Sequence, residues 1–118
     1  MIADLSSISQ IYIACGQTDL RKSIDGLAAI VQQNFKMNPF QNALFLFSGH
    51  KRDRFKALLW EGDGFVLLYK RLESGRLQWP ASPEAVRRLS AQEFRWLMEG
   101  LSLHQPKAVK SITVRDCI

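Results

Sequence analysis

Four short apolar runs between residues 44 and 80 constrain the fold of this chain more than any other feature. They cover residues 44–47, 55–60, 65–72 and 77–79 and are rich in Phe, Trp, Tyr, Val and Leu. Each run is shorter than a typical helix and is bounded by turn-forming residues, a pattern that favours strands. Parallel pairing requires a long crossover, so the short connections indicate antiparallel neighbours. The sequence predicts a four-stranded meander, with the rest of the chain covering one of its faces.

A fifth strand is predicted upstream of the meander, where residues 11–15 are β-branched and aromatic and stop at a glycine. The helix that follows is predicted to be capped by Thr18 or Asp19 and to end before Pro39, because apolar side chains recur between them at helical spacing. A long helix laid on a sheet buries the apolar faces of both elements. The expected fold class is therefore α+β.

The region after the meander is predicted to be helical. Residues 82–89 begin with a Ser-Pro-Glu sequence that is typical of a first helical turn. Ser90 and Glu93 match the capping-box pattern, and Gly100 is a stop signal for the helix that they begin. The complete expectation is a mainly antiparallel sheet of about five strands, with one long helix packed on a face and one or two C-terminal helices.

The length of 118 residues predicts a single domain over residues 1–118. A chain of this size buries enough surface to fold without disulfides or a metal. The core is expected over about 8–103, and 104–118 is a basic tail in which 112–114 would add an edge strand or stay disordered. The chain has two cysteines, no long apolar run and no signal-peptide pattern. These features predict a reducing, cytoplasmic location, no membrane contact, and no metal or cofactor.

Positive charge concentrates in the turns of the predicted meander. The chain carries a formal net charge of +5, and residues 50–76 hold seven basic and four acidic side chains, a surplus of three. Such a surface favours an anionic partner, with nucleic acid first. We expect hairpin folding to gather the seven cations on one side as a phosphate-binding surface. They are Lys51, Arg52, Arg54, Lys56, Lys70, Arg71 and Arg76. The alternative is a solvated surface whose charges protect edge strands.

Three sequence blocks are specific when their order and spacing are taken together. They are Thr-Asp-Leu-Arg-Lys with Asp-Gly-Leu at 18–27, Asp-Arg-x-Lys with Leu-Trp at 53–60, and Tyr-Lys-Arg-Leu-Glu with Trp-Pro at 69–80. Over about 11–103 the chain resembles the TnpB-type accessory proteins, the product of the second open reading frame of insertion-sequence family sixty-six. The resemblance implies a small protein that supports DNA transposition beside a separate transposase.

The expected function is non-catalytic support of transposition by binding DNA, the transposase of the same element, or both. The alternative is a protein–protein adaptor or a homodimeric scaffold without direct DNA contact. Candidate partner-binding residues are Arg21, Lys22, Trp60, Tyr69 and Trp96. Each of them also has a structural explanation, either in the first turn of the predicted helix or in the core. RNA ranks below DNA because no RNA-binding aromatic motif is present.

A metal-dependent nuclease is the third class of function considered. Its ligands would come from the acidic residues and the histidine of the first two-thirds of the chain: Asp19, Asp25, His50, Asp53, Glu61, Asp63 and Glu73. Most of these lie in predicted turns, caps or i,i+4 pairs, and they form no metal-ligand motif. We therefore expect no catalytic residue and no enzymatic activity.

Overall fold

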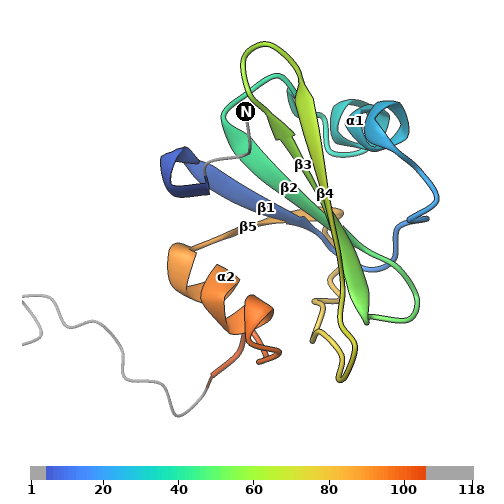
Figure 1. Cartoon of the computed structure of the whole chain (residues 1–118), viewed down its shortest axis with the longest axis vertical. Coiled ribbons are helices and arrows are strands. Elements are labelled where there is room, and N and C mark those ends of the chain that lie inside the picture. Colours follow the sequence, from blue (N-terminus) through green and yellow to red (C-terminus); the bar gives the residue numbers. More distant parts are fainter. Residues whose placement is uncertain (1–4, 106–118) are drawn as a thin grey trace, which may run out of the picture.

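The computed structural model describes residues 5–105 and shows an α+β fold built on a five-stranded sheet. The strands are β1 (Gln10–Ala14), β2 (Ala43–Ser48), β3 (Arg54–Trp60), β4 (Phe65–Arg71) and β5 (Val86–Leu89), and the helices are α1 (Ile24–Gln33), α2 (Ala91–Met98) and a 3₁₀ turn, η1 (Leu5–Ser7). The strand order is β4-β3-β2-β1-β5 (Figure 1). The predicted fold class is confirmed. The tail at 106–118, with its predicted strand at 112–114, lies outside the described residues.

The sheet is mixed because one of its connections is long. β2, β3 and β4 form an antiparallel meander through short turns, and β5 pairs antiparallel with β1. β1 instead pairs parallel with β2, from Gln10 opposite Ala43 to Ile13 opposite Leu46. The chain between these two strands contains α1, which supplies the crossover that parallel neighbours need.

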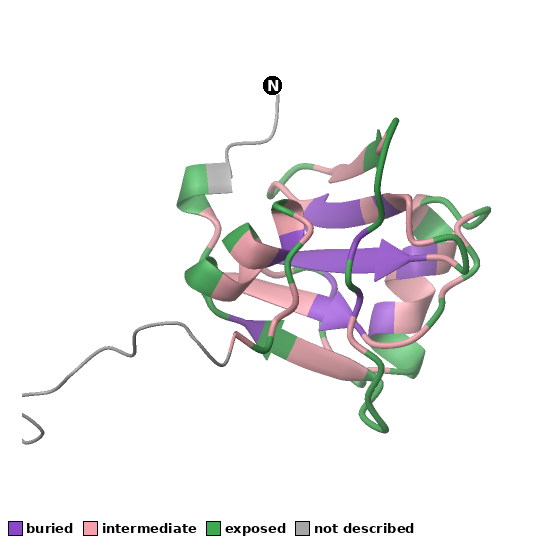
Figure 2. Cartoon of the chain, turned by 90° about the horizontal axis from the view of Figure 1, so that it is seen from below, coloured by how far each residue is buried: buried purple, intermediate pink, exposed green. Residues whose placement is uncertain are grey.

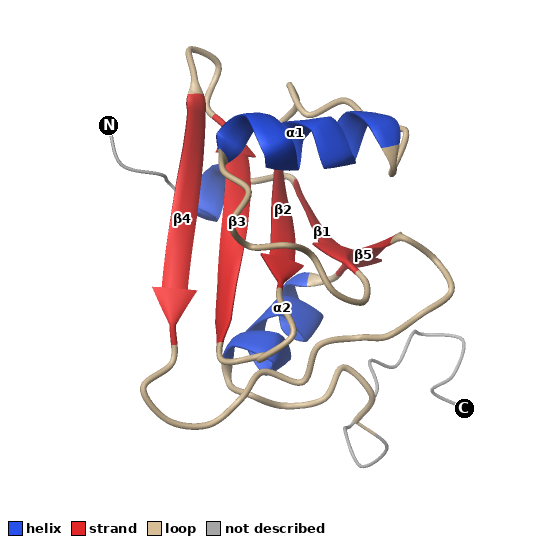
Figure 3. Ribbon diagram, turned by 90° about the vertical axis from the view of Figure 1, so that its right-hand side faces the viewer, coloured by secondary structure: helices blue, strands red, loops and turns tan. Residues whose placement is uncertain are grey.

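Both faces of the sheet are covered, whereas the sequence predicted a cover on one face only. α1 and α2 lie on opposite sides of the sheet (Figures 1 and 3). All six residues of β2 are consequently buried, and Figure 2 shows burial concentrated in the central strands. A strand buried on both faces reads as a continuous apolar run, as β2 does from Ala43 to Phe47.

The α1 side of the sheet is held by one stripe of the helix. Leu27 and Val31 are fully buried and belong to one cluster with Phe45, Phe47 and Leu58. α1 packs against β3 and β4 and lies across the sheet in Figure 3. Because α1 has only ten residues, it covers the middle of these strands and leaves the start of β3 and the end of β4 open.

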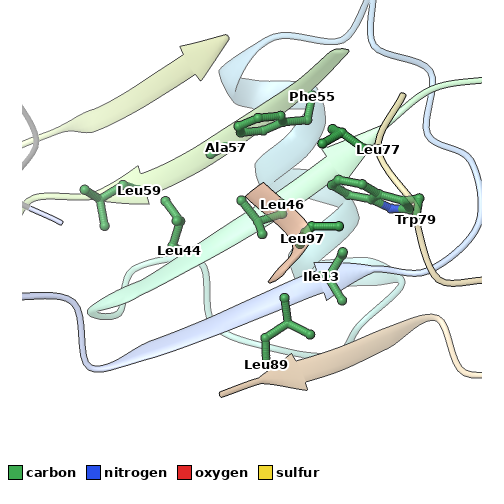
Figure 4. Packing of buried hydrophobic residues seen from close by; sticks show 10 residues of the cluster. All are labelled: Ile13, Leu44, Leu46, Phe55, Ala57, Leu59, Leu77, Trp79, Leu89 and Leu97. Carbon is green, nitrogen blue, oxygen red and sulfur yellow. The ribbon is translucent and has the colours of Figure 1, made fainter. Parts of the chain in front are cut away.

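The α2 side contains a second core that includes an irregular segment (Figure 4). Leu97 from α2 is fully buried against the sheet, and Leu77 and Trp79 complete the cluster. The prediction of a strand over 77–79 is wrong, since this segment has no ladder partner. Isolated hydrogen bonds hold it in place: the Leu77 N–H donates to the Arg52 carbonyl at 2.7 Å, and the Trp79 indole N–H donates to the Ala14 carbonyl at 2.8 Å.

The predicted helical turn over 82–89 is also wrong. Val86–Leu89 forms β5, with Ile11 opposite Leu89 and Ala14 opposite Val86. Pairing with the free edge of β1 outweighs the local helical signal, because context commonly overrides propensity in short segments. The capping box at Ser90 and Glu93 is confirmed as the start of α2.

Thr18 and Asp19 do not cap α1, which begins at Ile24 after Ser23. They belong to a separate turn, in which the Lys22 N–H donates to the Asp19 carbonyl at 3.1 Å. The helix also ends earlier than predicted, at Gln33, and the chain turns through Lys36, whose φ of 56° is left-handed. Within residues 5–105 no helix is long and apolar enough to cross a bilayer.

Candidate nucleic-acid interface

An open groove lies on the α1 side of the sheet, beside the uncovered parts of β3 and β4. Its volume is about 1180 Å³. Three parts of the chain line it: the turn before α1, the loop after β2, and alternate residues of β3 and β4. The lining residues are Gln17, Thr18, Asp19, Leu20, Arg21, Gly49, His50, Lys51, Arg54, Lys56, Leu67 and Tyr69. We call this feature the α1-side groove.

Strand alternation brings the charged and aromatic residues of β3 and β4 into the groove. Leu58 and Leu67 pack under α1, so the residues two or four positions away project on the same face. Lys56 pairs with Tyr69 across the ladder, and Arg54 lies two pairs further along, opposite Arg71. The Lys56 ammonium is 6.0 Å from the centre of the Tyr69 ring, which is within reach of a cation–π contact. Tyr69 is nevertheless 53% exposed.

The turn before α1 is fixed against the loop after β2 by short contacts. The Thr18 N–H donates to the Ser48 carbonyl at 2.8 Å. A Cβ at Gly49 would lie 3.4 Å from Leu20, so the bare glycine lets the loop approach that side chain closely. Leu20 therefore forms an apolar part of the groove wall.

Lys56 ties β3 to the same turn. Its ammonium donates to the Lys22 carbonyl at 2.9 Å. The stem of Lys22 lies over Gly26, where a Cβ would come within 3.0 Å of the Lys22 Cβ. The bare Gly26 therefore leaves room for the lysine stem. The Thr-Asp-Leu-Arg-Lys and Asp-Gly-Leu motifs thus fit together as one local unit at the groove.

Two carboxylates bind the arginines of the groove. Asp19 pairs with Arg21 at 2.8 Å, and the hydrogen bonds from the Arg21 side chain and backbone hold the pKa of Asp19 well below its usual range. Asp53 pairs with Arg54 at 2.8 Å, which lowers the pKa of Asp53 and raises that of Arg54. Both carboxylates therefore stay ionised near neutral pH and orient the guanidinium groups beside the groove.

The structure does not gather the seven predicted cations on one surface. Lys51, Arg54 and Lys56 line the α1-side groove. Arg71 lies opposite Arg54 on the same face, with its guanidinium 3.5 Å from the Glu73 carboxylate.

Three other predicted cations lie elsewhere. Lys70 follows Tyr69 directly and projects on the α2 side, since adjacent strand residues alternate. Arg52 donates to the Gly16 carbonyl at 2.8 Å, and burial lowers its pKa. Arg76 is exposed in the loop after β4.

The predicted partner-binding residues are also separated. Arg21 and Tyr69 line the groove, and Lys22 contributes its carbonyl beside it. Trp60 packs at the other end of β3, with its ring centre 5.0 Å from Phe40 and 4.9 Å from Phe65.

Trp96 is half-buried on α2, away from both of these sites.

Sequence reasoning missed Phe40 as an exposed aromatic residue, although it is 52% exposed. It also missed Leu20 and Leu67 as groove residues. The period-two alternation of β4 is a signal for Leu67.

The acidic residues considered as nuclease ligands do not come together. Among residues 5–105, no three His, Cys, Asp or Glu side chains are placed to hold a metal ion. Asp19 and Asp53 are in ion pairs with arginines, while Glu61 and Asp63 lie in the turn between β3 and β4. Cys15 is half-buried, and burial raises the pKa of its thiol, which disfavours a reactive thiolate.

Comparison with known proteins identifies relatives over most of the chain. The family model described as IS66 Orf2 like protein matches residues 9–108. The uncharacterized protein y4hO of Sinorhizobium fredii (strain NBRC 101917 / NGR234) is 33% identical over 98 residues, which cover 83% of this chain and 85% of that protein. The uncharacterized protein y4jC of the same organism is 32% identical over 92 residues, or 78% and 79% of the two chains. No solved structure matches. The family match includes every residue that lines the groove.

Proposed function

The chain belongs to the IS66 Orf2-like family of insertion-sequence accessory proteins, and from that premise we propose that it supports transposition by attaching to DNA through the α1-side groove. The family resemblance inferred from the three sequence blocks is thereby confirmed. In this proposal the protein catalyses no step itself. It holds DNA, and the separate transposase of the element performs the chemistry.

The observation that carries the proposal is the charge around the groove. Its lining contains four permanent cations, Arg21, Lys51, Arg54 and Lys56, and one carboxylate, that of Asp19. Cations placed in this way neutralise phosphates and release counterions, which gives an affinity that depends on salt and little on sequence. Lys51 is exposed and makes no hydrogen bond or salt bridge with the residues that the structure describes, so it is free to meet a phosphate.

A pair of charge-matched double variants tests the assignment. Lys51→Ala with Lys56→Ala removes two cations from the groove, and Lys70→Ala with Arg76→Ala removes two cations outside it. For the groove pair we expect the slope of log affinity against log salt to fall in magnitude by about two, with a loss of roughly tenfold or more in affinity at moderate salt. The control pair should leave the slope within about half a unit of the wild-type value.

Fluorescence anisotropy with a labelled duplex at several salt concentrations measures both quantities. Urea unfolding of each variant shows whether the loss of the Lys56 contact to the Lys22 carbonyl disturbs the fold. Equal weakening by the two double variants would reduce the interaction to net charge alone. The proposal would also be wrong if the groove pair left the binding unchanged.

A second candidate function is contact with the transposase through the aromatic residues at the far end of β3. Phe40, Trp60 and Phe65 pack together, and Phe40 remains 52% exposed. Trp60 and Phe65 flank the acidic turn that holds Glu61 and Asp63. Exposed aromatic groups of this kind are enriched at protein interfaces. Phe40→Ala should weaken binding to purified transposase of the same element and leave DNA binding unchanged. Unaltered transposase binding in a calorimetric titration would remove this candidate.

A further inference from the structure

We propose that the α1-side groove takes an unpaired stretch of DNA strand in preference to a duplex, with one base stacked on Tyr69 and a neighbouring phosphate near Lys51 and Arg54. This inference rests on the proposed function and names the form of DNA that the site receives. It follows from the shape of the groove, from its apolar lining and from the position of Tyr69.

The shape of the site suits a flexible strand. The cations surround a concave feature of about 1180 Å³, which is larger than a typical small-molecule site and has room for a nucleotide. A protein that reads a duplex usually inserts a protruding helix or ribbon into the major groove. Arg54 and Tyr69 instead lie within two neighbouring strands of the sheet, β3 and β4.

The lining of the groove includes the apolar surface that a base requires. Leu20 and Leu67 stand beside the cations, and Gly49 lets the loop after β2 lie close to Leu20. The bases of a duplex are stacked inside the helix and cannot reach such a wall, whereas an unpaired base exposes its ring faces. Proteins that bind single strands combine a positive groove with aromatic platforms in this way.

Tyr69 is the platform. It lies on β4, an edge strand of the sheet, and is 53% exposed while most aromatic residues of this chain are more buried. The Lys56 ammonium stands 6.0 Å from the ring centre and adds positive charge beside the platform. Arg54 holds Asp53 with Nε and one terminal nitrogen and also interacts with the Tyr69 side chain, so its guanidinium stands beside the platform.

The test compares two fluorescein-labelled probes, an oligothymidine of about 12 nucleotides and a duplex of the same length, within the size range that single-strand sites occupy. The proteins are the full chain, Tyr69→Ala and Tyr69→Phe. We expect the wild type to bind the single strand more tightly than the duplex at equal salt. Tyr69→Ala should lose on the order of tenfold in affinity for the single strand, with an unchanged salt slope, and Tyr69→Phe should retain it.

The outcomes separate this inference from the proposed function. If the wild type prefers the duplex, or if Tyr69→Ala weakens both probes equally, the inference is wrong, and the groove-cation variants still decide the proposed function. If the wild type binds neither probe, both fail together. A single strand of RNA with the same base sequence serves as a third probe, and tighter binding of that probe would overturn the choice of DNA.

Discussion

The two faces of the sheet are closed to different extents, and the difference separates stability from function. On the α2 side, a short helix and the irregular segment around Leu77 and Trp79 complete a core whose central residues are buried (Figure 4). On the α1 side, the helix covers one part of β3 and β4 and leaves the rest as an open groove. The exposed Tyr69 and the ion-paired Arg54 are both found on the α1 side.

Two aromatic residues represent this contrast. Trp79 is 8% exposed, stacks on Phe55 with ring centres 6.5 Å apart, and donates its indole N–H to the Ala14 carbonyl. Tyr69 is 53% exposed and lines the groove. We infer that the first residue serves the fold and that the second is available to a ligand. Changes at these two positions should therefore have opposite consequences for stability and for binding.

The largest effect is expected for Trp79→Ala. The variant leaves a cavity in the α2-side core and an unpaired Ala14 carbonyl, and it should lower the free energy of unfolding by about 3–5 kcal/mol. Tyr69→Ala should change it by less than about 1 kcal/mol, because the side chain is half in solvent. Urea unfolding followed by circular dichroism measures both values.

Trp79→Phe is the matched control for this comparison. It keeps an aromatic ring against Phe55 and removes the indole donor. Its free energy of unfolding should therefore lie between those of wild type and Trp79→Ala. If Trp79→Ala and Tyr69→Ala had equal effects on stability, the two faces would not differ in the way described.

The sequence was sufficient for the meander and insufficient for the segment that follows it. The runs that became β2, β3 and β4 are defined by local features, namely short apolar stretches and tight turns. In the turn after Trp60, Gly62 has a φ of +91° and the Glu61 N–H donates to the Gly64 carbonyl. Residues 77–79 alternate apolar and polar side chains, as a strand does. No local signal reveals that this segment crosses the sheet instead of joining its edge.

The prediction of β5 failed for a related reason. Val86–Leu89 pairs with β1, more than 70 positions earlier in the chain, as the register of Tyr12 opposite Arg88 shows. A four-residue strand carries little intrinsic preference, and its conformation depends on whether a distant edge is free. The helix α2 was predictable because its capping box is formed by neighbouring residues at its own N-terminus.

The candidate site was predictable in composition but not in geometry. The basic character of residues 50–76 is evident from the sequence, yet the side of the sheet depends on the parity of each strand position. Lys56 and Tyr69 share one face, while Lys70 is on the other. On β3, Arg54 and Lys56 alternate with the buried Phe55 and Ala57. This alternation is the sequence signal for which cations lie on the groove face. The contribution of Leu20 depends on the Gly49 contact, which no sequence pattern indicates.

A smaller effect, on stability alone, is expected for Arg52→Ala. Arg52 connects the loop after β2 to the Gly16 carbonyl, and its partial burial distinguishes it from Lys51. The loss of one charged hydrogen bond should lower the free energy of unfolding by about 1–2 kcal/mol and leave the salt slope of DNA binding unchanged. Lys51→Ala should show the reverse pattern. Urea unfolding and anisotropy titrations on the two variants provide the measurement, and a reduced salt slope for Arg52→Ala would move this residue into the interface.

The smallest effect, and the one most specific to the groove, is expected for Asp19→Asn. The amide oxygen can still accept from the Arg21 N–H at 3.0 Å, so the turn is retained while the groove loses its one negative charge. Freed from its ion pair, Arg21 should tighten DNA binding by about twofold to fivefold, which corresponds to the strength of an exposed pair. Asp63→Asn, which changes the same charge in the turn after β3, should leave the affinity unchanged.

The pH dependence of this difference follows from the lowered pKa of Asp19. A carboxyl whose pKa is lower in the folded state than in the unfolded state adds stability above its unfolded pKa of about 3.9, and this stability is lost as the pH falls through the lower folded value. Asp19 therefore stays ionised between about pH 5 and pH 8, and the affinity ratio of Asp19→Asn to wild type should be constant across that range. Anisotropy titrations at fixed ionic strength test this expectation. A ratio that falls towards one between those pH values would show that the carboxylate titrates there, and the ion pair with Arg21 would then not orient the guanidinium at the groove.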